Sequence, residues 1–390
     1  MLWGMNGTTP AAQSLSATAR PTRWEGDGLV LDTDFPGGNL QVEAIADGVV
    51  RVRQEQRDSP QWWFHWSFRI RGAAGRQIAV RFTDGEAVGV RGPALSSDDG
   101  RSWSWQEAQA GPRRAAFDIA LPATGSLRLA FGIPHELADW TAFTAAQPAL
   151  RPDVLCRTRH GREVPLARVG GATAAHLVLL TARHHCCEAM AGWALAGFAR
   201  AVLADPAWAA RAEVIFVPFV DLDGSEEGDQ GKGRRPRDHG RDYAGTSIYP
   251  ETAAIRAAYA GWAAGRPSAV IDLHCPWISG QYNQHIYQVG AAGDAWAQQR
   301  RLAGLLEACR RGPLPYRADG DLPFGQAWNV TTNYSEGRGI RGWAAEQPGC
   351  RLATTFEIPY ADASGTAVLP EGARAFGADL ASALAAYLDG

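Results

Sequence analysis

Hydrophobic residues follow two patterns along the chain, and the pattern changes near Ala149. From residue 28 to about residue 131, short β-type runs such as GLVLDTDF are separated by Gly, Pro, Asp and Ser. Short runs with turn residues between them are typical of an antiparallel β-sandwich. Prolines are scattered through residues 132–168, which favours a crossing between domains over a regular element. We therefore expect a β-sandwich domain over residues 25–149, preceded by a segment, residues 1–24, that frays.

From residue 150 onward, apolar strands alternate with amphipathic helices. The expected strands are HLVLLTAR, EVIFVPFV, SAVIDLH, HIYQVG and LATTFEIPY, and the expected helices cover 187–204, 250–264, 293–311 and 370–388. Apolar strands separated by helices of this length are typical of a mostly parallel sheet that is covered on both faces. The predicted fold class is α/β, with the N-terminal antiparallel β-sandwich followed by a mostly parallel α/β/α domain over residues 150–390.

Composition and charge exclude several classes of protein. A length of 390 residues is enough for two domains, and a formal net charge of -3 without a long basic run argues against nucleic-acid binding. The sequence has no uncharged apolar run of about 18 residues, the length a spanning helix needs. Its first 24 residues lack a signal-peptide core, and its six cysteines lack the paired spacing of a disulfide framework. We expect a cytoplasmic protein with no membrane partner. The sequence does not indicate the oligomeric state.

A His-rich turn joins the first of these apolar strands to the first helix. His185 and Glu188 lie three residues apart in this turn, where an open α/β sheet places its ligands. A catalytic zinc ion takes three protein ligands from His, Glu, Asp or Cys and keeps one position for water. His274 ends the strand AVIDLH, and a parallel strand would bring it to the same edge of the sheet. We therefore expect one zinc ion held by His185, Glu188 and His274, with Asp272 orienting a ligand imidazole.

Five motifs in order resemble those of the zinc carboxypeptidases, in particular the cytosolic carboxypeptidase-like branch. They are ARHHCCEAMAGWALAGF, VPFVDLDG, RPRDHGRDY, IDLHCPW and ATTFEIPY. The family motif places the ligand three residues before the Glu, which selects His185 over His184. FPGGNL and WWFHWSFRIRG also resemble the β-domain that precedes the catalytic domain in that branch. The resemblance therefore covers nearly the whole chain and implies a zinc peptidase that acts on a peptide or protein C-terminus.

The resemblance also implies roles for three charged residues. Glu357 lies inside an otherwise apolar strand, where an unpaired carboxylate is costly, and it matches the catalytic glutamate of the family, the general base. The polar loop over residues 223–243 is too long for a simple connection. By position, Arg234 matches the arginine that stabilises the oxyanion, with Arg235 as a rival, and Arg241 matches the clamp on the terminal carboxylate.

Three further positions concern the substrate. Gly240 stands where the family has an Asn beside its carboxylate clamp, so we expect a hydrogen bond to the terminal carboxylate to be lost. Tyr334, 23 residues before Glu357, matches a mobile tyrosine that closes over the substrate. Arg341 falls near the floor of the side-chain pocket, with Arg338 as an alternative. A positive charge there predicts a preference for acidic C-terminal residues.

Three functions fit these residues. The leading hypothesis is a zinc carboxypeptidase in which a metal-activated water, with Glu357 as general base, cleaves a C-terminal amide bond. The second is an amidohydrolase of small N-acyl amino acids, similar to desuccinylases and aspartoacylases; Gly240 favours it and the N-terminal β-domain disfavours it. The third is a catalytically inactive binding protein of the same fold.

Overall fold

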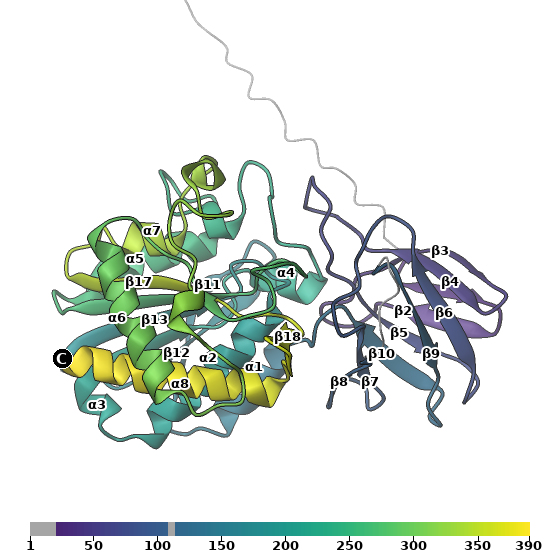
Figure 1. Cartoon of the computed structure of the whole chain (residues 1–390), viewed down its shortest axis with the longest axis horizontal. Helices are drawn as coiled ribbons and strands as arrows, with labels where there is room; N and C mark the ends of the chain where they lie inside the picture. The colour runs from purple at the N-terminus through teal and green to yellow at the C-terminus, as the bar shows by residue number, and fades with distance from the viewer. Residues whose placement is uncertain (1–20, 108–113) are drawn as a thin grey trace, which may run out of the picture.

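The computed structural model describes residues 21–107 and 114–390, and these form a β-rich part and an α/β part (Figure 1). Of the segment expected to fray, residues 1–20 lie outside the described residues, while β1 already begins at Arg23. None of the helices in these ranges has the length and hydrophobicity that crossing a bilayer requires.

Two small sheets make up the N-terminal part. The first has the strand order β1-β2-β5-β10-β7-β8, and the second has the order β3-β4-β6-β9. The strands are β1 (Arg23–Gly26), β2 (Leu29–Asp32), β3 (Gln41–Ala46), β4 (Val49–Arg53), β5 (Ser67–Arg71), β6 (Gln77–Phe82), β7 (Ala94–Ser96), β8 (Ser104–Trp105), β9 (Ala116–Ala120) and β10 (Ser126–Ala130). All pairs are antiparallel except β4 with β6, which is parallel.

Aromatic rings fill the space between these sheets. The ring of Trp66, just before β5, lies 5.1 Å from that of Phe82 in β6 and 5.8 Å from that of Phe117 in β9. Alternation in β6 buries Ile78, Val80 and Phe82 on one face, as expected for a strand that covers a core. The predicted β-sandwich is confirmed.

A seven-stranded sheet organises the C-terminal part, in the order β11-β12-β14-β13-β15-β17-β16. Its strands are β11 (Arg151–Arg157), β12 (Glu163–Val169), β13 (His176–Ala182), β14 (Ala212–Val217), β15 (Ser268–His274), β16 (Tyr287–Gln288) and β17 (Cys350–Glu357). The central strands β14, β13, β15 and β17 are parallel, whereas the strands at both edges pair antiparallel. A separate hairpin joins β18 (Asp362–Ala363) to β19 (Thr366–Ala367). The mostly parallel sheet predicted from the apolar strands is therefore its central portion.

Helices lie on both sides of this sheet, with α5 and α7 on one side of it and α8 on the other (Figure 1). The longer helices are α2 (Ala189–Ala204), α5 (Pro250–Ala263), α6 (Asp294–Cys309) and α8 (Pro370–Asp389), and the short ones are α3 (Trp208–Arg211), α4 (Leu222–Glu227) and α7 (Ile340–Ala344). All four predicted helices are present. Helices α2 and α8 approach each other so closely that a Cβ atom on Gly377 would lie 1.9 Å from the carbonyl oxygen of Ala194. Glycine, which has no Cβ atom, permits this approach.

The expected crossing over residues 132–168 is wrong, because this stretch contains α1 (Leu137–Ala145) and the hairpin β11–β12. Proline suggested irregular backbone, yet Pro152 lies in the edge strand β11, where a missing N–H is tolerated. Pro165 lies in β12, which pairs with β14 only over residues 167–169. Both prolines therefore avoid ladder positions that require a donor.

The register of the parallel strands brings chemical groups to one edge of the sheet. Asp272 of β15 pairs with Thr181 of β13, and His274 pairs with Glu357 of β17. The turn that follows β13 carries His185, and α2 begins one residue after Glu188. The carboxyl ends of parallel strands meet at one edge, so these side chains converge as the sequence predicted.

The β-sandwich holds the polar loop over residues 223–243 in place. The Asn39 side chain donates a hydrogen bond to the Gly228 carbonyl at 2.7 Å. The Gln230 side chain accepts from the His65 N–H at 2.8 Å and donates to the Glu55 carbonyl at 2.8 Å. These bonds span more than 160 residues of sequence, so the first domain fixes a loop beside the sheet edge.

Candidate metal centre

Three predicted ligands converge at the carboxyl edge of the sheet, and all three are buried. The Nδ1 atom of His185 lies 2.8 Å from Oε1 of Glu188, and Nδ1 of His274 lies 2.7 Å from Oε2 of Glu188. The two Nδ1 atoms are 3.2 Å apart. Zinc–nitrogen bonds of about 2.0–2.1 Å in a tetrahedron place neighbouring ligand atoms roughly 3.3 Å apart. Two nitrogens and a carboxylate at this spacing fit a zinc ion.

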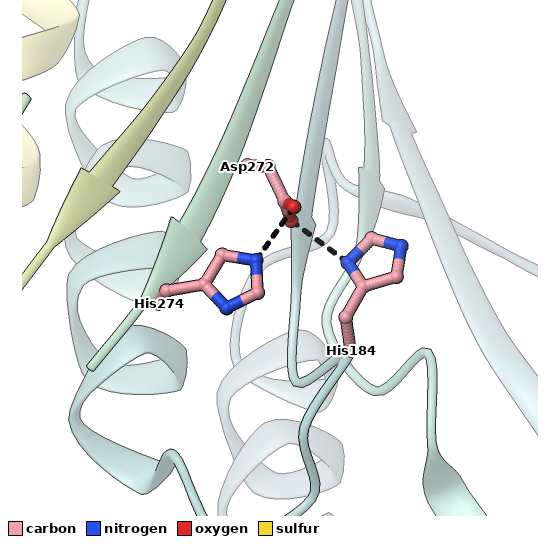
Figure 2. A group of neighbouring side chains, drawn as sticks. All are labelled: His184, Asp272 and His274. Carbon is pink, nitrogen blue, oxygen red and sulfur yellow. Dashed lines mark hydrogen bonds and ion pairs between the residues drawn. The ribbon is translucent and has the colours of Figure 1, made fainter. Parts of the chain in front are cut away.

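A second group shares His274 and includes His184 and Asp272 (Figure 2). Asp272 lies between the two imidazoles, with one oxygen 2.8 Å from Nδ1 of His184 and the other 2.7 Å from Nε2 of His274. Thr181 donates to Asp272 at 2.7 Å, and Nε2 of His184 lies 2.8 Å from the Tyr243 hydroxyl. Every nitrogen and carboxylate oxygen of His184 and Asp272 has a partner, so this group needs no ion.

Asp272 therefore fixes the orientation of His274 and leaves Nδ1 of that imidazole directed at Glu188. Although burial opposes it, the two imidazoles hold the pKa of Asp272 below its ordinary value, so the carboxylate is ionised at neutral pH. Such a hydrogen bond sets the tautomer of a ligand histidine and raises its basicity.

The substitution Asp272→Asn is expected to weaken metal binding by roughly 10- to 100-fold, because it replaces the carboxylate that orients His274. A chelator competition assay on the purified protein measures the metal dissociation constant. The matched control is Asp319→Asn, which makes the same chemical change at an exposed carboxylate. Equal metal affinity in Asp272→Asn and the wild type would show that Asp272 has no such role.

Glu357 ends β17 beside His274 and is buried. Its Oε2 atom has no hydrogen-bond partner among the described residues. Burial raises the pKa of Glu357 to about 7; nearby Glu188 also raises it, while His274 and Lys232 lower it. A buried carboxylate with a free oxygen and a pKa near neutrality can both accept and release a proton.

Arg234 occupies a different environment from the one predicted. Each of its three guanidinium nitrogens donates to a carboxylate, namely Asp58, Asp221 at 2.6 Å and Asp229 at 3.1 Å. This placement does not support an oxyanion role, because the guanidinium is already committed to three charged partners. The rival Arg235 is exposed and pairs with Glu336 at 3.0 Å.

Gly240 lies directly against the predicted ligand His185. A Cβ atom at this position would lie 2.5 Å from Nε2 of His185, so no side chain fits there. An Asn at this position would require the His185 imidazole to shift. Asp238, two residues earlier, places one carboxylate oxygen 3.7 Å from the same Nε2 atom.

Arg241, Tyr334 and Arg341 are close together. The Arg241 guanidinium lies 5.1 Å from the Tyr334 ring centroid, and Arg341 donates to the Tyr334 hydroxyl at 3.5 Å. Tyr334 itself donates to Asn329 at 2.7 Å. Among the described residues, neither arginine forms an ion pair with a carboxylate, and burial lowers the pKa of Arg341. Two cations without anionic partners can receive a negatively charged ligand.

Sequence reasoning missed one residue at this edge. The Lys232 ammonium lies 3.1 Å from Oε1 of Glu188. It lies in the polar loop over residues 223–243, in which the sequence predicts roles for the arginines. The available signal was residue type, because Lys232 is the only lysine in the sequence.

Comparisons with solved structures identify the fold. A metallo-carboxypeptidase from Burkholderia cenocepacia superposes with a TM-score of 0.74 at 19% identity, over 93% of this chain and 99% of that one. A metallo-carboxypeptidase from Pseudomonas aeruginosa, in complex with (2-guanidinoethylmercapto)succinic acid, gives 0.71 at 19% identity, over 92% and 99%. No protein-family model and no curated protein matches the sequence. The chain therefore has the metallo-carboxypeptidase fold, with the N-terminal β-sandwich included.

Proposed function

We propose that this protein is a zinc-dependent carboxypeptidase that hydrolyses the last peptide bond of a peptide or protein. The observation that carries the proposal is the convergence of His185, Glu188 and His274 at the sheet edge where Glu357 lies, with a buried Oε2 atom that has no hydrogen-bond partner among the described residues. The likeness to metallo-carboxypeptidases over nearly both full chains supports it. An inactive binding protein would have no need of a general base at this place.

In the proposed reaction, each residue at this sheet edge has its own role. His185, Glu188 and His274 would hold the zinc, which when bound supplies a Lewis acid that activates water and polarises the carbonyl group. Glu357 accepts a proton from the attacking water and transfers it to the leaving amine. Asp272 keeps the His274 imidazole in the orientation that presents Nδ1.

We further propose that the enzyme prefers acidic C-terminal residues. Arg241 would bind the terminal carboxylate and Arg341 the side-chain carboxylate, since neither forms an ion pair with a carboxylate in the described parts of the chain. Tyr334 lies between them and would close over the substrate. Because Gly240 offers no side chain, the terminal carboxylate depends more on Arg241 than it would beside an Asn.

Arg341→Gln is expected to lower kcat/KM for a C-terminal Glu by roughly 10- to 100-fold, the value of about one or two charged hydrogen bonds. Its effect on a C-terminal Leu should stay within about threefold, since Leu offers no carboxylate to pair. Initial rates on three peptides that end in Glu, Leu or Lys test this. Arg338→Gln removes the competing candidate, which pairs with Glu346. A wild type that prefers Lys would contradict the proposal.

A second candidate is the hydrolysis of small N-acyl amino acids. The absence of a side chain at Gly240 favours it, because part of the usual peptide clamp is missing. Activity on free N-acyl amino acids with none on peptides would establish this alternative. A cytoplasmic location also stays a prediction, and the six unpaired cysteines agree with it.

A further inference from the structure

Lys232 has an unusual identity and an unusual place. The sequence contains 38 lysines and arginines together, and only Lys232 is a lysine. Its side chain is 23% exposed, and its Nζ atom lies 3.1 Å from Oε1 of Glu188 and 5.4 Å from the Trp63 ring centroid. All the remaining residues of this set of 38 are arginines. The one lysine places its compact ammonium group beside Glu188, a predicted ligand of the metal.

The backbone on either side of Lys232 lies close to the turn that carries His185. Gly231 and Gly233, on either side, have φ values of +73° and +61°. A Cβ atom on Gly231 would lie 2.6 Å from the backbone nitrogen of Cys186, next to the ligand His185. Only glycine adopts this conformation at such a distance without strain. The loop therefore lies directly on the turn that carries a ligand.

The N-terminal domain fixes the same segment from the other side. Ser59 donates a hydrogen bond to the Lys232 carbonyl, and Gln230 is held by the backbone of His65 and Glu55. Trp63 covers the ammonium through its ring face. Lys232 is thus a positioned charge, unlike a lysine on a solvated loop.

We propose that Lys232 is the cation that stabilises the oxyanion during peptide hydrolysis, the role that the sequence predicted for Arg234. Arg234 is bound to three carboxylates, whereas Lys232 reaches a metal ligand. The inference rests on the proposed carboxypeptidase function. A preorganised cation at the developing oxyanion stabilises the transition state more than the substrate.

The water oxygen bonds to the carbonyl carbon while one water proton passes to Glu357, and the electron pair of the C=O π bond moves onto the carbonyl oxygen. The Lys232 ammonium donates a hydrogen bond to this oxyanion. The pair then re-forms the C=O bond as the C–N bond breaks, and the amine nitrogen takes the proton from Glu357.

Steady-state kinetics on the zinc-loaded enzyme test the role of Lys232. Lys232→Met is expected to lower kcat by about 100-fold or more, with KM within about threefold, as for other oxyanion donors. Lys232→Arg keeps a cation and is expected to retain more activity than Lys232→Met. Arg317→Met, which removes an exposed charge paired with Asp319, is the control and should leave kcat unchanged.

Binding provides a second readout that needs no turnover. A phosphinic peptide, whose tetrahedral oxygens imitate the oxyanion, should bind Lys232→Met more weakly by the same factor as the loss in kcat/KM, while zinc content stays unchanged. Since Lys232 is the only lysine, reductive methylation with ¹³C-formaldehyde labels it together with the terminal amine. Its NMR signal should shift when the phosphinic peptide binds to the wild type.

The outcomes separate the two proposals. A wild type that cleaves peptides, with a Lys232→Met variant that cleaves them within about tenfold of its rate, overturns the role of Lys232 alone. Loss of zinc in Lys232→Met, or an unmoved lysine signal on inhibitor binding, overturns it as well. A wild type that cleaves no peptide overturns the carboxypeptidase function, and the role of Lys232 falls with it.

Discussion

Replacing Glu357 by Gln lowers kcat for peptide hydrolysis by about 100- to 10,000-fold, the usual contribution of a general base, and leaves zinc bound. Gln has nearly the same shape but cannot accept the proton of the attacking water. The buried Oε2 atom of the carboxylate has no hydrogen-bond partner within residues 21–107 and 114–390, so the substitution breaks no hydrogen bond of that oxygen there. Mass spectrometry of the released C-terminal residue, together with the zinc content of the variant, measures both effects.

The matched control for this result is Glu346→Gln, the same chemical change at an exposed glutamate that pairs with Arg338. It should leave kcat within about twofold of the wild type, as surface substitutions away from special features do. A Glu357→Gln variant that keeps more than about a tenth of the wild-type kcat would show that another group takes the proton.

Replacing His185 by Ala abolishes both zinc binding and hydrolysis. Two ligands remain, and a catalytic zinc site is built from three protein ligands. The smaller side chain introduces no clash and leaves space beside Gly240, next to which the imidazole lies. Zinc measured by mass spectrometry after gel filtration should fall from about one per chain to a trace.

His160→Ala is the control for that result. His160 is exposed and belongs to a third group of possible ligands, with the half-buried Asp223 and Glu227, which shares no residue with the predicted zinc ligands. The His160→Ala variant should keep its zinc and its activity. Loss of zinc in His160→Ala, with zinc retained in His185→Ala, would move the metal site to the exposed group.

The fold and the convergence of the predicted ligands could be anticipated from local pattern, from strand order and from the resemblance to the zinc carboxypeptidase motifs. A strand that ends in His274 and a turn that carries His185 and Glu188 meet once both strands are parallel, and register then brings Glu357 beside them. The four helices predicted from amphipathic patterns are present, and their observed ends differ from the predicted ends by no more than two residues. These features depend on neighbours in sequence or on one rule of topology.

The roles of residues in the loop over 223–243 could not be predicted in the same way. Contacts with the N-terminal domain determine where the side chains of this loop lie. Arg234 is bound by Asp58, which lies 176 residues earlier, and no local pattern indicates that pairing. The sequence shows a glycine at position 240, but it does not show that the His185 imidazole lies where a side chain would extend. The α1 helix and the β11–β12 hairpin were not predicted, because the prolines in this stretch indicated irregular backbone. The sequence does not show which positions of a strand need no backbone N–H donor.

The most direct test of the carboxypeptidase proposal is the metal content of the purified protein, combined with digestion of a mixed peptide library that is read by mass spectrometry. The proposal predicts about one zinc per chain and the release of single C-terminal residues, acidic ones first. Chelation of the metal should stop the release, and added zinc should restore it. Bound zinc without any shortened peptide would contradict the proposal, and so would cleavage that continues without the metal.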